Sequence, residues 1–335
     1  MVNYKKWVKR GFLRTGLLSL ARRLKGPRTL ILRYHSIKAD PDAYADSLGR
    51  GIIHSADAFR AQMEWLARTF EPVSLDDVAA SVQGRRPMPG KGVVVTFDDG
   101  YADNAEVAAP VLERLGMRGA FYVTTGYVEP EKVPWFCRLR HAFAVTTAET
   151  WREPAGERVR RLAEPQERRQ AFLSASASCA RQAGAAQDAL LDHIERELAV
   201  ESYAPPERLM LSWEQARELR CRGHVVGSHT VTHPNLAQTG ADEVSREFGE
   251  SKKLLEKKLG EPVCHFSYPS PILQPHWDER TVACCREHGY ETAVTCTPGP
   301  VLAADSPLSL KRIAAPEKLD DFKWAVENAF LGRCV

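Results

Sequence analysis

Short apolar runs alternate with segments of helical spacing along most of this chain. Residues 30–34 form a first apolar run, and residues 55–70 place apolar side chains at every third or fourth position, as an amphipathic helix does. Residues 92–97 are apolar almost throughout, which is typical of a strand buried inside a parallel sheet. The same order recurs further along, with strands predicted at 120–124, 224–228, 263–268 and 290–296 and helices at 103–115, 212–222, 242–259 and 319–331.

This repeated order of strand and helix predicts an α/β fold, a parallel sheet with its helices outside. The number of units suits a barrel better than an open sheet. The rhythm breaks at about residues 130–206, which are rich in Arg, Glu, Gln and Ala and show no clear strand. We expect a helical insertion there, over one end of a barrel domain that spans residues 29–335.

Charge is distributed unevenly although the net charge of +3 is too small to indicate nucleic-acid binding. Basic residues crowd residues 1–28, where leucines recur at helical spacing and no acidic residue occurs. This segment predicts a basic amphipathic helix that either lies on an anionic membrane surface or packs on the edge of its own domain. No apolar run is long enough for a secretory signal or a membrane span, so we expect a cytoplasmic protein in peripheral contact with the inner membrane.

Two polar clusters follow predicted strands. Asp98 and Asp99 come directly after residues 92–97, and two adjacent carboxylates repel unless a cation or hydrogen bonds compensate them. His229 and His233 follow residues 224–228, and on a helical turn this spacing places both rings on one side of the chain. Taken singly, the aspartates could cap a helix and the histidines could be surface residues.

Position favours a joint site. In a parallel barrel the carboxyl ends of the strands gather at one face, and His35 and residues 267–270 also follow predicted strands. Two carboxylates and two imidazoles at that face could hold a catalytic divalent metal beside its own general base. The pattern therefore predicts a metal-dependent hydrolase.

Residues 96–101 (TFDDGY) and 228–234 (SHTVTHP) resemble the first two motifs of polysaccharide deacetylases, the NodB-homology domain of carbohydrate esterase family four. The similarity extends over about residues 29–129 and 207–331. It implies a distorted (β/α) barrel of seven or eight strands that removes N-acetyl groups from the amino sugars of a polysaccharide, or of its lipid-linked precursor, in exopolysaccharide biosynthesis.

The same resemblance implies roles for individual residues. Asp98 would be the general base, and a divalent metal would be held by Asp99, His229 and His233. That metal is usually zinc, with nickel, cobalt or iron as alternatives. The backbone N–H of Ser270 would stabilise the oxyanion of the tetrahedral intermediate.

The chain departs from the commonest family pattern in two places. Ser267 stands where many members have an arginine, and a late Leu-x-His motif is missing. Instead, residues 32–35 (LRYH) resemble the subgroup that acts on poly-N-acetylglucosamine, in which the barrel is circularly permuted. We therefore expect His35 to be the general acid, the alternative being a buried histidine that hydrogen-bonds to the backbone. We expect Arg312 to orient Asp98, the alternative being that Arg312 forms an ordinary surface ion pair.

Two other functions fit the same residues. A related C–N hydrolase, such as a sugar deformylase or a cyclic-amide hydrolase, would use the same carbonyl chemistry. A catalytically silent barrel that only binds glycan is the second alternative, and the missing third-motif arginine is its only support.

Overall fold

The computed structural model describes residues 17–129, 132–154 and 158–333, together with Lys9, Gly11, Leu13 and Thr15. Of the helix predicted over residues 1–28, residues 1–8, 10, 12, 14 and 16 therefore lie outside the described residues. Its described part contains α2 (Leu17–Arg23), which leads into the first strand of the sheet. Within the described ranges, the structure has no helix with the length and apolar character that a membrane span requires.

An eight-stranded parallel sheet forms the centre of the molecule, in the order β11-β10-β9-β6-β5-β1-β12, with the short β4 also paired to β5. An isolated parallel bridge joins Val294 of β11 to Leu310, just before β12, and so brings the two edges of the sheet together. The sheet is thus a distorted (β/α) barrel, which confirms the predicted fold class. Its strands are β1 (Thr29–Tyr34), β4 (Glu71–Pro72), β5 (Gly92–Phe97), β6 (Gly119–Val123), β9 (Val225–Ser228), β10 (His265–Ser267), β11 (Thr292–Val294) and β12 (Ile313–Ala314).

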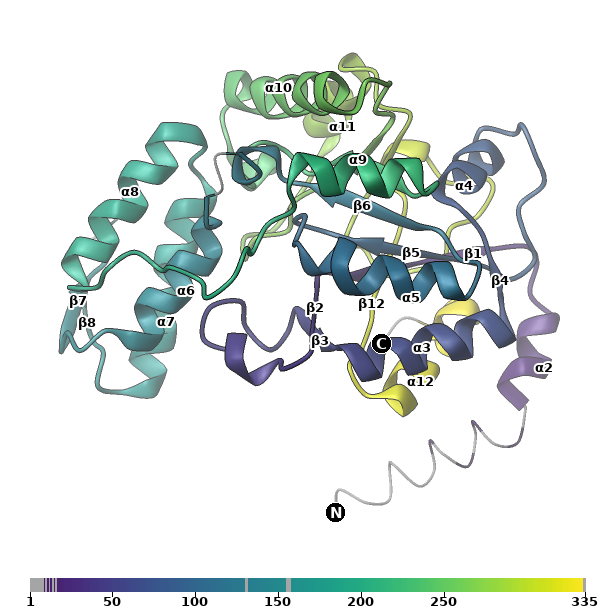
Figure 1. Cartoon of the computed structure of the whole chain (residues 1–335), viewed down its shortest axis with the longest axis horizontal. Helices are drawn as coiled ribbons and strands as arrows, with labels where there is room; N and C mark the ends of the chain where they lie inside the picture. The colour runs from purple at the N-terminus through teal and green to yellow at the C-terminus, as the bar shows by residue number, and fades with distance from the viewer. Residues whose placement is uncertain are drawn as a thin grey trace.

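Helices pack around the outside of the sheet (Figure 1). Three of them begin at capping boxes, built by Ser74, Ser212 and Asp278, whose side chains accept hydrogen bonds from backbone N–H groups that the helix leaves without a partner. The helix expected at 103–115 begins with a π-helical turn, η2 (Asn104–Ala108). The helices are α3 (Ala56–Thr69), α4 (Leu75–Val82), α5 (Ala109–Arg114), α9 (Trp213–Cys221), α10 (Ala241–Leu259), α11 (Glu279–Glu287) and α12 (Leu319–Phe330).

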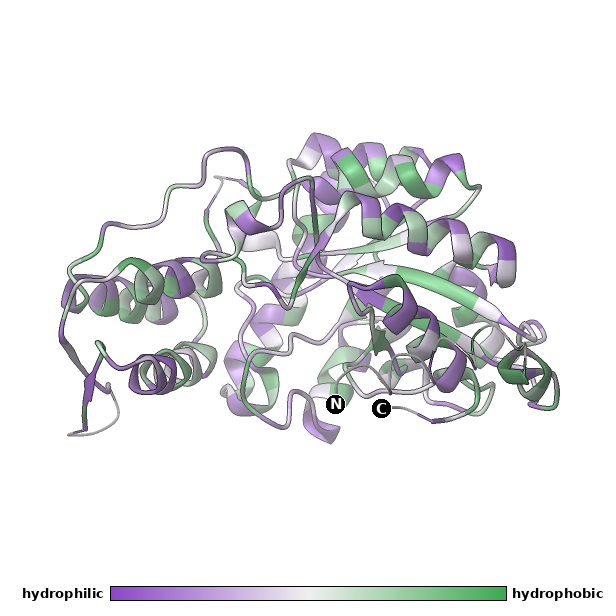
Figure 2. Cartoon of the chain, turned by 90° about the horizontal axis from the view of Figure 1, so that it is seen from below, coloured by the Kyte–Doolittle hydropathy of each residue, from purple (hydrophilic) through white to green (hydrophobic). Residues whose placement is uncertain are grey.

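Alternate residues of the strands face opposite sides of the sheet. Leu32 and Val95 pack with residues of the outer helices, whereas Ile31, Val94 and Tyr122 belong to a separate apolar cluster inside the barrel. In Figure 2 the central strands are largely green and white, whereas the helices carry both purple and green residues. Because the period is two residues, the positions after Val94 that face inward are the polar Thr96 and Asp98.

A helical lobe stands beside the barrel (Figure 1). It has its own apolar core, which includes Tyr101 from the TFDDGY motif. The sequence shows no strand in this region, but the structure contains an antiparallel pair, β7 and β8, of three residues each with only the central residue buried. Such short strands with charged flanks give too few positions for a recognisable alternation. The lobe comprises α6 (Trp135–Val145), β7 (Thr150–Arg152), β8 (Val159–Arg161), α7 (Pro165–Ala180) and α8 (Gly184–Glu197).

A small parallel pair, β2 (Ser36–Lys38) and β3 (Ile53–Ser55), follows β1 at its carboxyl end. The loop between its strands contains η1 (Asp42–Tyr44) and reaches the helical lobe, where Tyr44 and Leu48 join the lobe's apolar core. Further single turns are η3 (Thr125–Tyr127), η4 (Leu236–Gln238) and η5 (Pro307–Ser309).

Candidate active site

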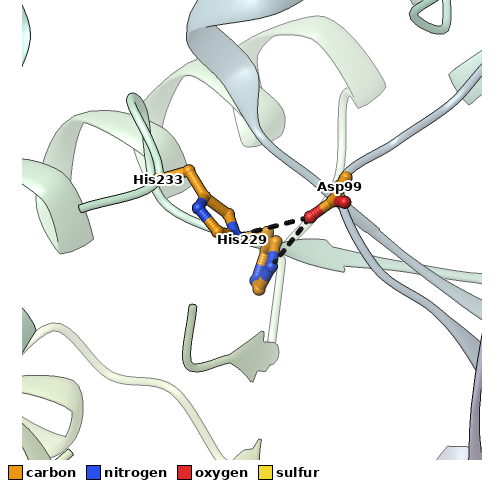
Figure 3. A group of neighbouring side chains, drawn as sticks. All are labelled: Asp99, His229 and His233. Atoms are coloured by element: carbon orange, nitrogen blue, oxygen red, sulfur yellow. Dashed lines mark ion pairs between the residues drawn. The ribbon is translucent and has the colours of Figure 1, made fainter. Parts of the chain in front are cut away.

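The carboxyl ends of the parallel strands bring three potential metal ligands together. Asp99 follows β5, and His229 follows β9 with His233 four residues later. The Nε2 atoms of His229 and His233 each lie 3.4 Å from the same oxygen, Asp99 Oδ1 (Figure 3). All three side chains are buried, so water screens their charges poorly.

These separations fit a shared cation better than hydrogen bonds. A good N–H···O hydrogen bond is about 2.9 Å long, whereas donor atoms bound tetrahedrally at about 2.1 Å lie about 3.4 Å apart. One nitrogen from each ring and one carboxylate oxygen lie within 4.8 Å of one another. The residues present therefore fit a divalent cation with three protein ligands and open positions for water and substrate.

The loop that carries the histidines is not the helical turn that their spacing suggested. None of residues 229–233 is helical: Val231 and Thr232 form a bend, and Thr230 and His233 have φ angles of 71° and 58°, in the left-handed region. The two rings nevertheless converge, with centroids 4.9 Å apart. The expectation of a helix was wrong because the loop is held by partners far away in the sequence.

Glu247 on α10 is the main partner of this loop, and the sequence analysis missed it. Its buried carboxylate accepts hydrogen bonds from the backbone N–H of Val231 and of Thr232, at 2.6 and 2.9 Å. A glutamate in the buried stripe of a helix was the only available signal. The Trp135 indole of the lobe also donates to the carbonyl of His233, at 3.2 Å.

Ser267 orients His229 and contacts Asp98. Its carbonyl lies 2.7 Å from Nδ1 of His229, which assigns the ring proton to Nδ1 and leaves Nε2 free to bind a cation. Its hydroxyl donates to Asp98 Oδ1 at 3.1 Å. Ser267, which stands where the resemblance leads us to expect an arginine, therefore contacts Asp98 itself.

Arg312 supplies the guanidinium that Ser267 lacks. Its Nη1 and Nη2 each donate to one oxygen of Asp98, both at 2.7 Å, and its Nε donates to the carbonyl of Thr295. The side chains of Asp98 and Arg312 are 2% and 1% exposed, so this is a buried bidentate pair and not a surface ion pair. Burial alone would raise the pKa of Asp98, but the guanidinium outweighs it and holds that pKa far below the ordinary value.

His35 follows β1 and lies at the same edge of the barrel. Asn104 fixes its backbone by donating to its carbonyl at 2.7 Å. Burial lowers the pKa of His35 to about 4, although Asp99 and Asp98 act in the opposite direction. The ring is therefore neutral at pH 7 in the metal-free protein.

A cleft of about 360 Å³ opens onto these residues. His35, Asp99, His233 and Ser270 border it on the barrel side, and aromatic residues of the lobe border it on the other. The structure thus brings together all seven site residues expected from the sequence: His35, Asp98, Asp99, His229, His233, Ser270 and Arg312. Their chemical roles remain predictions.

A family model described as "Polysaccharide deacetylase" matches residues 85–293, and the chain belongs to this family. The match contains both signature motifs, whereas His35 and Arg312 lie outside it. Among curated proteins, YxkH of Bacillus subtilis, which carries the polysaccharide deacetylase name, is 20% identical over 84% of this chain and 70% of its own length. The poly-β-1,6-N-acetyl-D-glucosamine N-deacetylase of Escherichia coli K12 is 39% identical over 57 residues, which are 17% of this chain and 8% of that protein.

Solved structures show the same fold. The deacetylase PplD of Streptococcus pyogenes, solved with acetate, aligns with a TM-score of 0.59 at 20% identity, over 89% of this chain and 97% of PplD. IcaB of Ammonifex degensii aligns with a TM-score of 0.58 at 20% identity, over 91% of this chain and 99% of IcaB. These similarities show that the fold is shared over nearly the whole chain, beyond residues 85–293.

Proposed function

We propose that this protein is a metal-dependent hydrolase that removes N-acetyl groups from the amino sugars of a glycan. The observation that carries the proposal is the 3.4 Å separation of Asp99 Oδ1 from each of two imidazole nitrogens, beside the buried carboxylate of Asp98. Family membership supports deacetylation, and this donor set supports metal dependence.

Asp99, His229 and His233 would hold the cation. Zinc suits two imidazoles and one carboxylate with open positions, and the same set also accepts iron, cobalt or nickel. When bound, a divalent cation polarises the acetyl carbonyl and lowers the pKa of a water towards ~7.

Three residues of the chain would move protons and stabilise charge. Asp98 would take the proton of the attacking water, and Arg312 would keep its carboxylate ionised and oriented for that step. His35, neutral at pH 7, would receive the proton and pass it to the departing amine. The backbone N–H of Ser270 would donate to the oxyanion that forms on the acetyl group.

The substrate that we propose is a glycan that contains N-acetylglucosamine, either a polymer or its lipid-linked precursor. Support comes from the Escherichia coli relative, whose name states this chemistry, and from aromatic side chains of the lobe that border the cleft, since sugar rings bind well to apolar faces. A role in exopolysaccharide biosynthesis follows from the same relationship.

We also propose that α2 places the protein on an anionic membrane surface in the cytoplasm. Its inner face packs on α12, where Arg22 pairs with Glu327 at 2.9 Å. Its outer face carries Leu17 and Leu20, and Leu24 follows its last residue; these leucines are 53%, 59% and 84% exposed, next to basic residues. The strand β1 lies between α2 at its start and His35 at its end. Its length of about 20 Å would therefore separate the membrane surface from the cleft.

Acetate release from N-acetylglucosamine oligomers tests the hydrolase directly. Protein stripped with chelator should be inactive, and zinc or cobalt should restore activity. Asp98→Asn should abolish release, whereas Asp57→Asn, a surface carboxylate on α3, should not change it. Release without metal would contradict the mechanism, and formate release from formylated sugars alone would favour a deformylase.

Vesicle sedimentation tests the membrane contact. We expect the protein to pellet with phosphatidylglycerol vesicles more than with phosphatidylcholine vesicles. Replacement of the three exposed leucines by serine should reduce pelleting without changing the melting temperature. Unchanged pelleting would contradict a role for α2.

A further inference from the structure

Arg140 on α6 borders the cleft, and the catalytic proposal gives it no task. In the described part of the chain it has no carboxylate within ion-pair distance and no hydrogen-bond acceptor. Its neighbour Arg138, on the same helix, differs because it is paired with Asp192 and Glu195 outside the cleft. Desolvation lowers the pKa of Arg140, and no nearby carboxylate offsets that effect.

The guanidinium of Arg140 is nevertheless held in a defined position. Its Cζ lies 4.8 Å from the ring centroid of Phe172 on α7. Gly49 packs against it at a φ of 90°, and a Cβ on Gly49 would come within 2.8 Å of the guanidinium. A ring and a glycine backbone thus fix the group without using its N–H donors.

The charge of the cleft is unbalanced. Of the residues that border it, Asp99 is the one carboxylate, and that carboxylate is committed to the proposed cation. Arg33 on β1 adds a second guanidinium from the barrel side, and its described polar contact is with Cys296 Sγ. A positively charged cleft with free guanidinium donors is complementary to a carboxylate or a phosphate.

We propose that Arg140 binds an oxyanion carried by the acetylated glycan, so that the substrate is an anionic form of this glycan and not a neutral one. This inference rests on the proposed function, since it concerns the same cleft. Bidentate contact with an oxyanion is the chemistry for which a planar, preoriented guanidinium is best suited. The oxyanion could be the carboxylate of a uronic acid or a phosphate on the sugar.

Calorimetric binding to the metal-free protein tests the proposal without depending on catalysis. The carboxylate probe is an oligosaccharide of alternating N-acetylglucosamine and glucuronic acid, compared with a neutral N-acetylglucosamine oligomer of equal length. The phosphate probe is N-acetylglucosamine 1-phosphate, compared with N-acetylglucosamine. We expect at least one anionic probe to bind about tenfold more tightly than its neutral partner, and the probe that does so identifies the oxyanion.

Variants then assign the preference to one residue. Arg140→Gln should remove the preference, Arg140→Lys should keep part of it, and Arg169→Gln, an exposed arginine on α7, should leave it unchanged. Melting temperatures of the variants establish that each is folded. Equal binding of charged and neutral probes, or a preference that survives in Arg140→Gln, would overturn the proposal. Absence of acetate release would refute the proposed function and leave this binding result interpretable.

Discussion

Replacing Arg312 with methionine removes the one guanidinium that compensates the buried charge of Asp98. Both side chains are at most 2% exposed, and two hydrogen bonds of 2.7 Å join them. Loss of one partner of a buried, hydrogen-bonded ion pair costs about 3–5 kcal/mol, because the remaining charge stays desolvated. We therefore expect Arg312→Met to lower the free energy of unfolding by about that amount.

Urea unfolding of the metal-free protein at pH 7, followed by tryptophan fluorescence, measures this loss. The double variant Asp98→Asn with Arg312→Met should be more stable than Arg312→Met alone, because it no longer buries an unpaired carboxylate. Arg60→Met is the matched control, since Arg60 pairs with Asp57 at 3.1 Å on the surface and its loss should cost less than ~0.5 kcal/mol.

The pH dependence provides a second test of the same pair. The pKa of Asp98 is depressed in the folded protein, so its stabilising contribution is present above the unfolded pKa of 3.8 and is lost as pH falls below it. The difference between wild type and Arg312→Met should therefore narrow below about pH 4. A destabilisation under ~1 kcal/mol at pH 7, or a difference that widens in acid, would refute the reasoning.

Three other predictions follow from buried groups. Burial lowers the pKa of His35 from 6.5 to about 4, so between these pH values the unfolded chain binds more protons than the folded protein and the folded protein loses stability as the pH falls. His35→Asn should reduce this loss of unfolding free energy by ~3 kcal/mol in the metal-free protein. An unchanged dependence of the unfolding free energy on pH would contradict this. Glu247→Ala should weaken zinc binding about 10- to 100-fold, because the loop that carries the histidines loses the carboxylate that accepts its backbone hydrogen bonds. Competition with a chelator measures the affinity, and an unchanged affinity would exclude a role of Glu247 in positioning the histidines. Burial raises the pKa of the Cys137 and Cys179 thiols to about 12, so the exposed Cys221 should be alkylated before either of them at pH 8. Modification of either buried thiol as early as Cys221 would show that the lobe opens.

Local patterns predicted the elements of this fold well. The apolar run at 92–97 is β5, and the Ser212 capping box begins α9 as expected, because burial on both faces and capping chemistry depend on neighbouring residues. The pair β7 and β8 was missed, since three residues are too few to show a period. The two-residue β12 was missed for the same reason, although it completes the sheet beside β1.

The candidate site was predictable to the extent that it lies at strand ends. Asp98, Asp99 and His229 were placed at one face because parallel strands share their direction, and that inference needs only the order of the elements. The role expected for Arg312 had no such basis in the sequence, because its partner Asp98 lies 214 residues away.

The sequence by itself determined the family, the alternation of strands and helices in an α/β barrel and the residue types at the carboxyl ends of its strands, because motifs and periodicity are properties of adjacent residues. Tertiary structure alone decided that Glu247 holds the histidine loop, that Arg312 forms a buried pair with Asp98, and that Arg140 borders the cleft without an acidic partner among the described residues. These contacts join segments far apart in the chain, and their strength depends on burial, which no local pattern encodes.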